Sequence, residues 1–219
     1  MTTAIPVDDR QSLAEVHGDI DRYYSAKIIR HGVSPRGVDW TCQATQELRF
    51  VQLVKLFGSA AALSLNDLGC GYGALLDFLR RRHAGLTLDY LGIDLSKEMV
   101  RRAKRKWRGV PDAAFAQDTA PRRAADYSVA SGIFNVQLDQ PTALWEAFIA
   151  TTLRDLRNAS LAGFAVNFLA PLAADQPPRH GLYRTAPEPW IRYCRDDLGG
   201  TTTLLDAYGM REFTILVQV

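Results

Sequence analysis

Cysteine is scarce in this sequence: Cys42, Cys70 and Cys194 lie far apart among 219 residues. No two of them have the CxxC spacing that is typical of a zinc or redox site, and an odd number leaves one thiol unpaired. These features exclude a scaffold held together by disulfides, and we expect no bound metal. Reduced thiols are typical of a cytoplasmic protein.

The sequence also lacks long apolar runs and a leader pattern. It begins MTTAIPVDDRQ, without the basic start and the apolar stretch of a secretory signal. No segment has the roughly 20 consecutive apolar residues that a membrane-spanning helix requires. We therefore expect a cytoplasmic protein with no membrane partner.

An excess of one charge is likewise absent. Lys and Arg number 26 against 24 Asp and Glu, which gives a formal net charge of +2. This balance does not indicate a nucleic-acid-binding protein. The dense basic run from Arg101 to Gly109 fits the solvated face of an amphipathic helix. We expect no nucleic-acid partner.

The chain does contain an alternation of apolar strands and amphipathic helices that begins near Ala61. Strands are predicted over 62–69, 86–95, 113–118, 126–134 and 161–169, and helices over 73–85, 96–107 and 141–159. This alternation is typical of a doubly wound α/β fold. Two more strands, 201–209 and 211–219, are too close together for a helical crossover and predict a hairpin. We expect a seven-stranded, mostly parallel sheet with an antiparallel last strand.

Two regions lie outside this alternation. Residues 1–60 predict an N-terminal helical cap, because segments 19–32 and 45–58 have helical periodicity and end on Gly32 and Gly58. Residues 170–198 are rich in proline and polar residues and predict an insertion, with a short helix over 187–199. We expect one domain, 1–219, with its core over 61–219.

A glycine-rich turn follows the first predicted strand, in LNDLGCGYGALLDFL over residues 65–79. Bare backbone before a helix lets a ligand approach closely, so this turn indicates nucleotide binding in general. The GxGxG spacing completes neither a dinucleotide fingerprint nor a phosphate loop. Asp67 would repel a pyrophosphate and attract a positively charged ligand.

Acidic residues also end the next two predicted strands, Asp94 in LGIDLS and Asp118 in AFAQDT. The carboxyl ends of parallel strands share one edge of the sheet, so the three aspartates should line one crevice. At the end of the second strand an acidic residue commonly accepts two ribose hydroxyls. The pattern favours a cationic nucleoside.

Taken in order, DLGCGYG, GIDLSKEMVRRAK, FAQD and DYSVASGIF resemble the class I S-adenosylmethionine-dependent methyltransferases over about residues 61–219. The resemblance implies S-adenosylmethionine as cofactor and S-adenosylhomocysteine as its product. It also implies a site residue by residue: Asp67, Gly69, Cys70, Gly71 and Gly73 for the methionine part, Asp94 for the ribose, Leu95, Met99, Asp118 and Thr119 for the adenine, and Ser131 on the path to the methyl group.

The sequence departs from the family pattern at one point. Seven residues separate Asp118 from Asp126, so the helix that normally joins the third and fourth strands can be at most a turn. This shortening puts the adenine-side wall of the site, and the role of Asp118, in question.

The acceptor side is less well marked, because methyl transfer from a sulfonium requires alignment more than a particular catalytic group. By the resemblance, the N-terminal helices and the segment after the fifth strand form lids. His31 and Tyr24 are candidate bases, and Arg49 could meet the cofactor carboxylate or an acidic substrate. The candidate lid residues are Tyr23, Trp40, Phe134, Tyr183 and Trp190.

The sequence predicts an enzyme, monomer or homodimer, that methylates an O or N atom of a small-molecule acceptor. Asn135 lacks the neighbouring prolines of the motif of nucleic-acid amino-methyltransferases, so that role is not assigned. Two alternatives stay open: a non-catalytic cofactor-binding module that acts through a protein partner, and a nicotinamide-dependent oxidoreductase.

Overall fold

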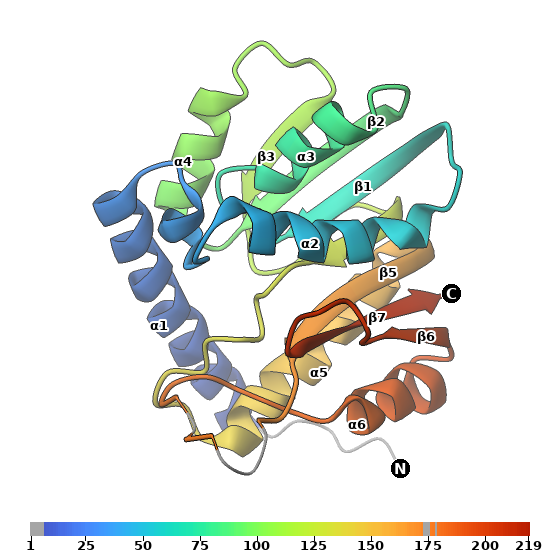
Figure 1. Ribbon diagram of the computed structural model, residues 1–219. Coiled ribbons are helices and arrows are strands. Elements are labelled where there is room, and N and C mark those ends of the chain that lie inside the picture. Colours follow the sequence, from blue (N-terminus) through green and yellow to red (C-terminus); the bar gives the residue numbers. More distant parts are fainter. Residues whose placement is uncertain (1–6, 173–175, 178) are drawn as a thin grey trace.

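The computed structural model describes residues 7–172, 176–177 and 179–219, and its centre is a seven-stranded sheet (Figure 1). The strands are β1 Ala62–Leu68, β2 Thr87–Asp94, β3 Ala113–Gln117, β4 Ala125–Ala130, β5 Ser160–Leu169, β6 Thr201–Leu205 and β7 Glu212–Gln218. They lie in the order β3-β2-β1-β4-β5-β7-β6, and β7 runs antiparallel to both neighbours. The predicted fold class is confirmed.

Helices cover both faces of this sheet. They are α1 Val7–His31, α2 Gln43–Leu53, α3 Ala74–Arg82, α4 Lys97–Lys106, α5 Thr142–Asn158 and α6 Pro187–Arg192. Residues of α2, α3 and α4 pack in one apolar cluster with β1 and β2, whereas α5 and α6 pack in another with β5 and β7. The two clusters lie on opposite faces because successive side chains of a strand point to opposite sides.

The helix α1 lies along the carboxyl ends of the parallel strands, and Figure 1 shows it reaching from α5 to α4. Val16 and Ile20 pack into the cluster that contains α5, while Ile28 packs with Tyr72 and Met99. The helix begins at Val7, well before the predicted start at Asp19, and ends before Gly32, whose φ is 67°. Its length lets it cover the whole edge where the aspartates end their strands.

The second predicted N-terminal helix is present as α2, which continues into the short 3-10 helix η2, Val54–Phe57. A further 3-10 turn, η1 Pro35–Val38, connects α1 to α2, with the Ser34 side chain accepting from the Gly37 N–H at its start. This connection carries Trp40 toward the carboxyl edge of the sheet.

The end of β4 differs from the sequence prediction, whereas the connection between β3 and β4 agrees with it. The strand expected over 126–134 ends at Ala130, because Gly132 takes a φ of 75° and donates its N–H to the Asn167 side chain. Residues 118–124 contain no helix, as the short spacing between Asp118 and Asp126 predicts.

The predicted insertion at 170–198 falls partly outside the described residues, at 173–175 and 178. Its described part contains α6 and the π turn η3, Tyr193–Asp197, which lie beside β6 and β7. Among the described residues, no helix is both long and apolar enough to cross a membrane.

Candidate active site

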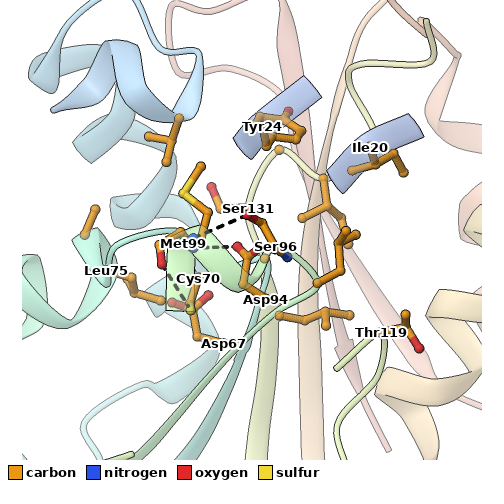
Figure 2. Close-up of a pocket in the computed structure, with 18 of the residues that line it drawn as sticks. Ile20, Tyr24, Asp67, Cys70, Leu75, Asp94, Ser96, Met99, Thr119 and Ser131 are labelled. Carbon is orange, nitrogen blue, oxygen red and sulfur yellow. Dashed lines mark hydrogen bonds between the residues drawn. The ribbon is translucent and has the colours of Figure 1, made fainter. Parts of the chain in front are cut away.

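A pocket with about 950 Å³ of empty space, part of it open to solvent, lies at the carboxyl edge of the sheet (Figure 2). Its floor comes from the strand ends and its cover from α1, so that Ile20 and Tyr24 lie across the space from Asp67. Many predicted site residues line it: Tyr24, Trp40, Asp67, Gly69, Cys70, Gly71, Asp94, Leu95, Met99, Asp118, Thr119 and Ser131.

The glycine turn between β1 and α3 has positive φ at each glycine: 75° at Gly69, 56° at Gly71 and 78° at Gly73. A Cβ on Gly69 would lie 2.2 Å from Ile133, and one on Gly71 would lie 2.7 Å from Val38. Larger residues would therefore strain the backbone and also collide with the pocket wall. Gly73 instead packs against Trp107, outside the pocket.

The N–H groups of this turn are already used inside the protein. Gly69 and Cys70 both donate to the Ile93 carbonyl, and Gly71 donates to the Asp94 carboxylate. A phosphate cradle needs such groups free. The turn is therefore shaped for close approach of a ligand and does not offer these three donors to an anion.

Asp94 ends β2 with its carboxylate held by two backbone donors. One oxygen accepts from the Ser96 N–H at 2.8 Å, and the other from the Gly71 N–H at 2.9 Å. Burial raises the pKa of Asp94 to about 6, although these two hydrogen bonds act in the opposite direction. Each oxygen keeps a further lone pair, so the carboxylate can accept two ligand hydroxyls.

Asp67 lies at the base of the pocket and is only 2% exposed. Burial raises its pKa to about 7, partly offset by the Tyr90 hydroxyl, which donates to it at 2.5 Å. Nearby Asp94 raises the pKa further. A ligand with positive charge would favour the ionised form of both carboxylates.

Asp118 differs from the other two aspartates because its carboxylate is already engaged. The Arg122 guanidinium donates to both of its oxygens, at 2.8 and 2.9 Å, and the Thr119 and Ala120 N–H groups donate to one of them. Arg122 holds the pKa of Asp118 below its usual range. An adenine amine would have to compete with these donors.

The wall on the α4 side is made by Leu95, Ser96 and Met99. The Ser96 side chain accepts from the Met99 N–H at 3.3 Å and so begins α4, and it also lies 2.6 Å from the Ser25 hydroxyl of α1. This contact connects the covering helix α1 to the start of α4. The Ser131 Oγ, just after β4 in the pocket lining, is buried and has no partner among the described residues.

Several lining residues were missed by the sequence analysis. His17 and Ile20 share the face of α1 with Tyr24, and Gln46 and Phe50 come from α2, so helical spacing alone was a usable signal. Phe148 and Thr152 of α5 line the pocket beside Thr119. They face the space because no helix covers them between β3 and β4.

Other predicted residues do not line the pocket. The Tyr23 hydroxyl donates to Asp39 at 2.6 Å, and His31 lies at the end of α1. Arg49 forms a buried ion pair with Glu212 and lies 3.7 Å from the centre of the Trp40 ring. Tyr24 does face the pocket, but burial raises its pKa well above the usual value, which disfavours it as a base.

The predicted lid residues Phe134, Tyr183 and Trp190 are buried in the apolar cluster around α5. The rings of Phe134 and Trp190 each stack on Phe168, with centroids 5.0 and 5.7 Å away. The Tyr183 hydroxyl donates to Glu146 at 3.0 Å. The structure therefore places these three side chains beneath the site and not over it.

The pocket fits a cationic amino-acid nucleoside. Two buried carboxylates with raised pKa suit a ligand that carries positive charge and hydroxyls, and Gly69 and Gly71 present bare backbone to the pocket that they line. The unpartnered Ser131 Oγ offers one more hydrogen bond. Met99 and Leu95 add the apolar surface that an adenine ring requires.

Comparison with known proteins agrees with this geometry. Residues 66–158 match the family described as Methyltransferase domain. Over 165 residues, 75% of this chain, the sequence is 44% identical to a protein of Mycobacterium tuberculosis strain H37Rv named as methyltransferase Rv1506c, of which 98% is covered.

Solved structures share the fold at low identity. Magnesium protoporphyrin IX methyltransferase from Synechocystis PCC 6803, solved with S-adenosylmethionine, matches with a TM-score of 0.59 and 18% identity, over 100% of this chain and 99% of the other. DhpI, solved in a complex named DhpI-SAM-HEP, matches with a TM-score of 0.61 and 14% identity, over 94% and 98%. The chain belongs to the class I methyltransferases that use S-adenosylmethionine as cofactor.

Proposed function

We propose that this methyltransferase transfers the methyl group to an O or N atom of a small molecule. The observation that carries this proposal is the cover formed by α1, which lies over the pocket with His17, Ile20 and Tyr24 facing inward. Trp40, which lies in the connection between α1 and α2, adds to this cover. A concave pocket covered by a helix is suited to a small molecule.

Charge supports the same proposal. The residues that line the pocket in the described part of the chain include no Lys or Arg that could follow a nucleic-acid backbone. The basic residues of α4 lie on its outer face, where Arg101 and Arg102 pair with Glu98 and Lys104 is exposed. This is the solvated helix face that the sequence predicts.

The roles proposed for the cofactor residues follow from their contacts. Asp94 would accept the two ribose hydroxyls, and Asp67 with the glycine turn would hold the methionine part. Leu95 and Met99 would flank the adenine, with Thr119 nearer to it than the engaged carboxylate of Asp118. When bound, S-adenosylmethionine supplies an electrophilic methyl group on a good leaving group.

The chain's own contribution is then mainly alignment and exclusion of water. We propose that residues 1–60 act as the lid within a single domain of 1–219, because α1 forms the cover. Proton removal is not assigned to His31, which does not line the pocket, or to Tyr24, whose pKa is raised. Cytoplasmic location and a monomeric or dimeric state remain predictions.

Transfer of a labelled methyl group tests this proposal. The purified protein is incubated with methyl-labelled S-adenosylmethionine and with a bacterial extract separated into metabolite, nucleic-acid and protein fractions. We expect label in the metabolite fraction, and much less label when Asp94→Asn replaces the wild type at the same concentration of cofactor. Label confined to nucleic acid or protein would contradict the proposal. Cofactor binding without any transfer would favour the non-catalytic alternative.

A further inference from the structure

A group of buried polar side chains lies next to the pocket without lining it. It consists of Arg49, Asn135, Asn167 and Glu212, which we call the polar cluster; they are 4%, 5%, 1% and 5% exposed. Each has one buried polar atom without a partner among the residues that the structure describes: Arg49 Nε, Asn135 Oδ1, Asn167 Nδ2 and Glu212 Oε2. Buried polar atoms without a partner require an explanation, and a bound ligand is one that would satisfy several of them together.

Arg49 and Glu212 form the charged half of the polar cluster. The guanidinium pairs with the Glu212 carboxylate and also donates to the Thr45 carbonyl at 2.7 Å. The two charges cancel each other, and one donor and one acceptor are left over. The Trp40 ring lies on the guanidinium, with its centre 3.7 Å away.

Asn135 and Asn167 form the uncharged half, and both lie at Gly132. The Asn167 Oδ1 accepts from the Gly132 N–H at 2.7 Å, which fixes the amide so that its nitrogen is the free atom. The Asn135 amide is 3.4 Å from the place of a Cβ on Gly132. The Trp40 ring lies 2.4 Å from the same Cβ position on Gly132. This indole therefore lies against both halves of the polar cluster.

The polar cluster continues directly into the cofactor pocket. Trp40, Ser131 and Gly132 line that pocket, and Ser131 carries a further unpartnered hydroxyl. Asn167 and Glu212 lie at the end of β5 and the start of β7, which form the same edge of the sheet as the ends of β1 and β2. A molecule bound at the polar cluster would thus lie beside the glycine turn.

The free atoms define the chemistry of that molecule. Arg49 Nε and Asn167 Nδ2 are donors, whereas Glu212 Oε2 and Asn135 Oδ1 are acceptors. A carboxylate or phosphate would satisfy only the donors, and an ammonium would satisfy only the acceptors. Hydroxyl groups both donate and accept, so a molecule with several hydroxyl groups matches this mixed set of atoms.

We propose that the polar cluster binds the methyl acceptor and that this acceptor is a polyhydroxylated compound, a sugar or a molecule that carries one. Trp40 covers the polar cluster, so its indole turns aside when the acceptor enters, and its ring then packs against the C–H face of the sugar. This assignment rests on the proposed small-molecule function and specifies the substrate class of that site.

Saturation-transfer NMR on the protein saturated with S-adenosylhomocysteine tests this assignment. The probes are methyl glycosides of common hexoses and 6-deoxyhexoses, with benzoate as an anionic compound and catechol as a planar phenol. The variant is Asn135→Leu, since Asn135 Oδ1 has no hydrogen-bond partner among the described residues and its replacement should not impair folding. The control is Asn158→Leu, an exposed residue at the end of α5, away from the pocket.

We expect saturation of at least one glycoside by the wild type and by Asn158→Leu. Asn135→Leu should weaken that binding about tenfold, the effect of one lost hydrogen bond, and leave cofactor affinity unchanged. The double variant Arg49→Met/Glu212→Leu, which removes both buried charges together, provides a second variant with the same expected direction. The assignment is overturned if no glycoside binds while the cofactor product does, or if both cluster variants bind glycosides like the wild type. Methylation of a phenol or amine without glycoside binding would overturn only this assignment and leave small-molecule methylation intact.

Discussion

At the scale of single residues, the two hydrogen bonds that Asp94 accepts favour a carboxylate over an amide at this position. Both of its oxygens accept from backbone N–H groups, so an amide at this position would place its own N–H against one of these donors. We expect Asp94→Asn to weaken binding of S-adenosylhomocysteine roughly 10- to 100-fold, which corresponds to about 1.5–3 kcal/mol. Isothermal titration calorimetry measures this change.

Asp77→Asn is the matched control, because Asp77 lies on α3 and pairs with Arg81 away from the pocket. Its affinity should equal that of the wild type. Equal affinity of the Asp94→Asn variant would remove Asp94 from the cofactor site.

The buried carboxylate of Asp67 makes stability depend on pH. Its pKa of about 7 in the folded protein lies above the ordinary value of 3.8, so the fold favours the protonated form. The contribution of Asp67 to stability is therefore complete below about pH 4 and is lost as the pH rises through 7. The loss is on the order of a few kcal/mol at pH 8.

Asp67→Asn should thus be more stable than the cofactor-free wild type at pH 8, and this advantage should vanish near pH 4. The Tyr90 hydroxyl can still donate to the amide oxygen, so the fold is retained. Urea denaturation of both proteins between pH 4 and 8 measures the difference. A difference that does not change with pH would show that Asp67 titrates normally.

At the scale of elements, α1 is the part of the molecule that must respond to the cofactor. It lines the pocket through His17, Ile20 and Tyr24 and contacts α4 through the Ser25–Ser96 pair. Because it forms the cover of the pocket, a bound cofactor would contact it and stabilise its covering position. Saturation with S-adenosylhomocysteine should slow amide hydrogen exchange in α1, by up to about a hundredfold at 100 times Kd.

Mass spectrometry of exchanged peptides checks this expectation. Peptides from β6 serve as the internal control, since that strand lies at the far side of the sheet. Unchanged exchange in α1, with protection of the glycine turn, would mean that α1 is a fixed wall and not a lid.

Elements were also the scale at which the sequence was most informative. The nearly continuous apolar run of β5 indicates a strand buried on both faces, and the short spacing between β6 and β7 permits only a hairpin. The spacing between Asp118 and Asp126 correctly predicts the absence of a helix. These features depend on local pattern, which a single sequence contains.

The rest of the site depends on contacts between distant segments. No local pattern pairs Arg49 with Glu212 or puts Trp40 against Gly132, and Phe148 faces the pocket only because a helix is absent elsewhere. The same limit explains Trp190, an aromatic residue near a variable segment that packs on Phe168 in the core. Aromatic composition alone does not separate a lid from a core.

At the scale of the whole molecule, the Arg49–Glu212 pair connects a helix that precedes the sheet to the last strand of the sheet. Arg49 belongs to α2, before the first strand, and Glu212 begins β7, the last strand, 163 residues later. Both side chains are about 95% buried, so each charge depends on the other for compensation. The pair thus holds the N-terminal segment on the face of the completed sheet.

Arg49→Met should therefore lower the free energy of unfolding by about 3–5 kcal/mol, because Glu212 would remain buried without a partner. The double variant Arg49→Met/Glu212→Leu removes both charges and should recover most of this loss. Urea denaturation of the wild type, both single variants and the double variant measures the four free energies of unfolding. Losses that simply add would mean that the two charges do not compensate each other. The apolar replacements restore packing but supply neither a donor nor an acceptor. We therefore expect a double variant of recovered stability to bind S-adenosylhomocysteine but no glycoside. This result would separate the role of the pair in stability from its role in acceptor binding.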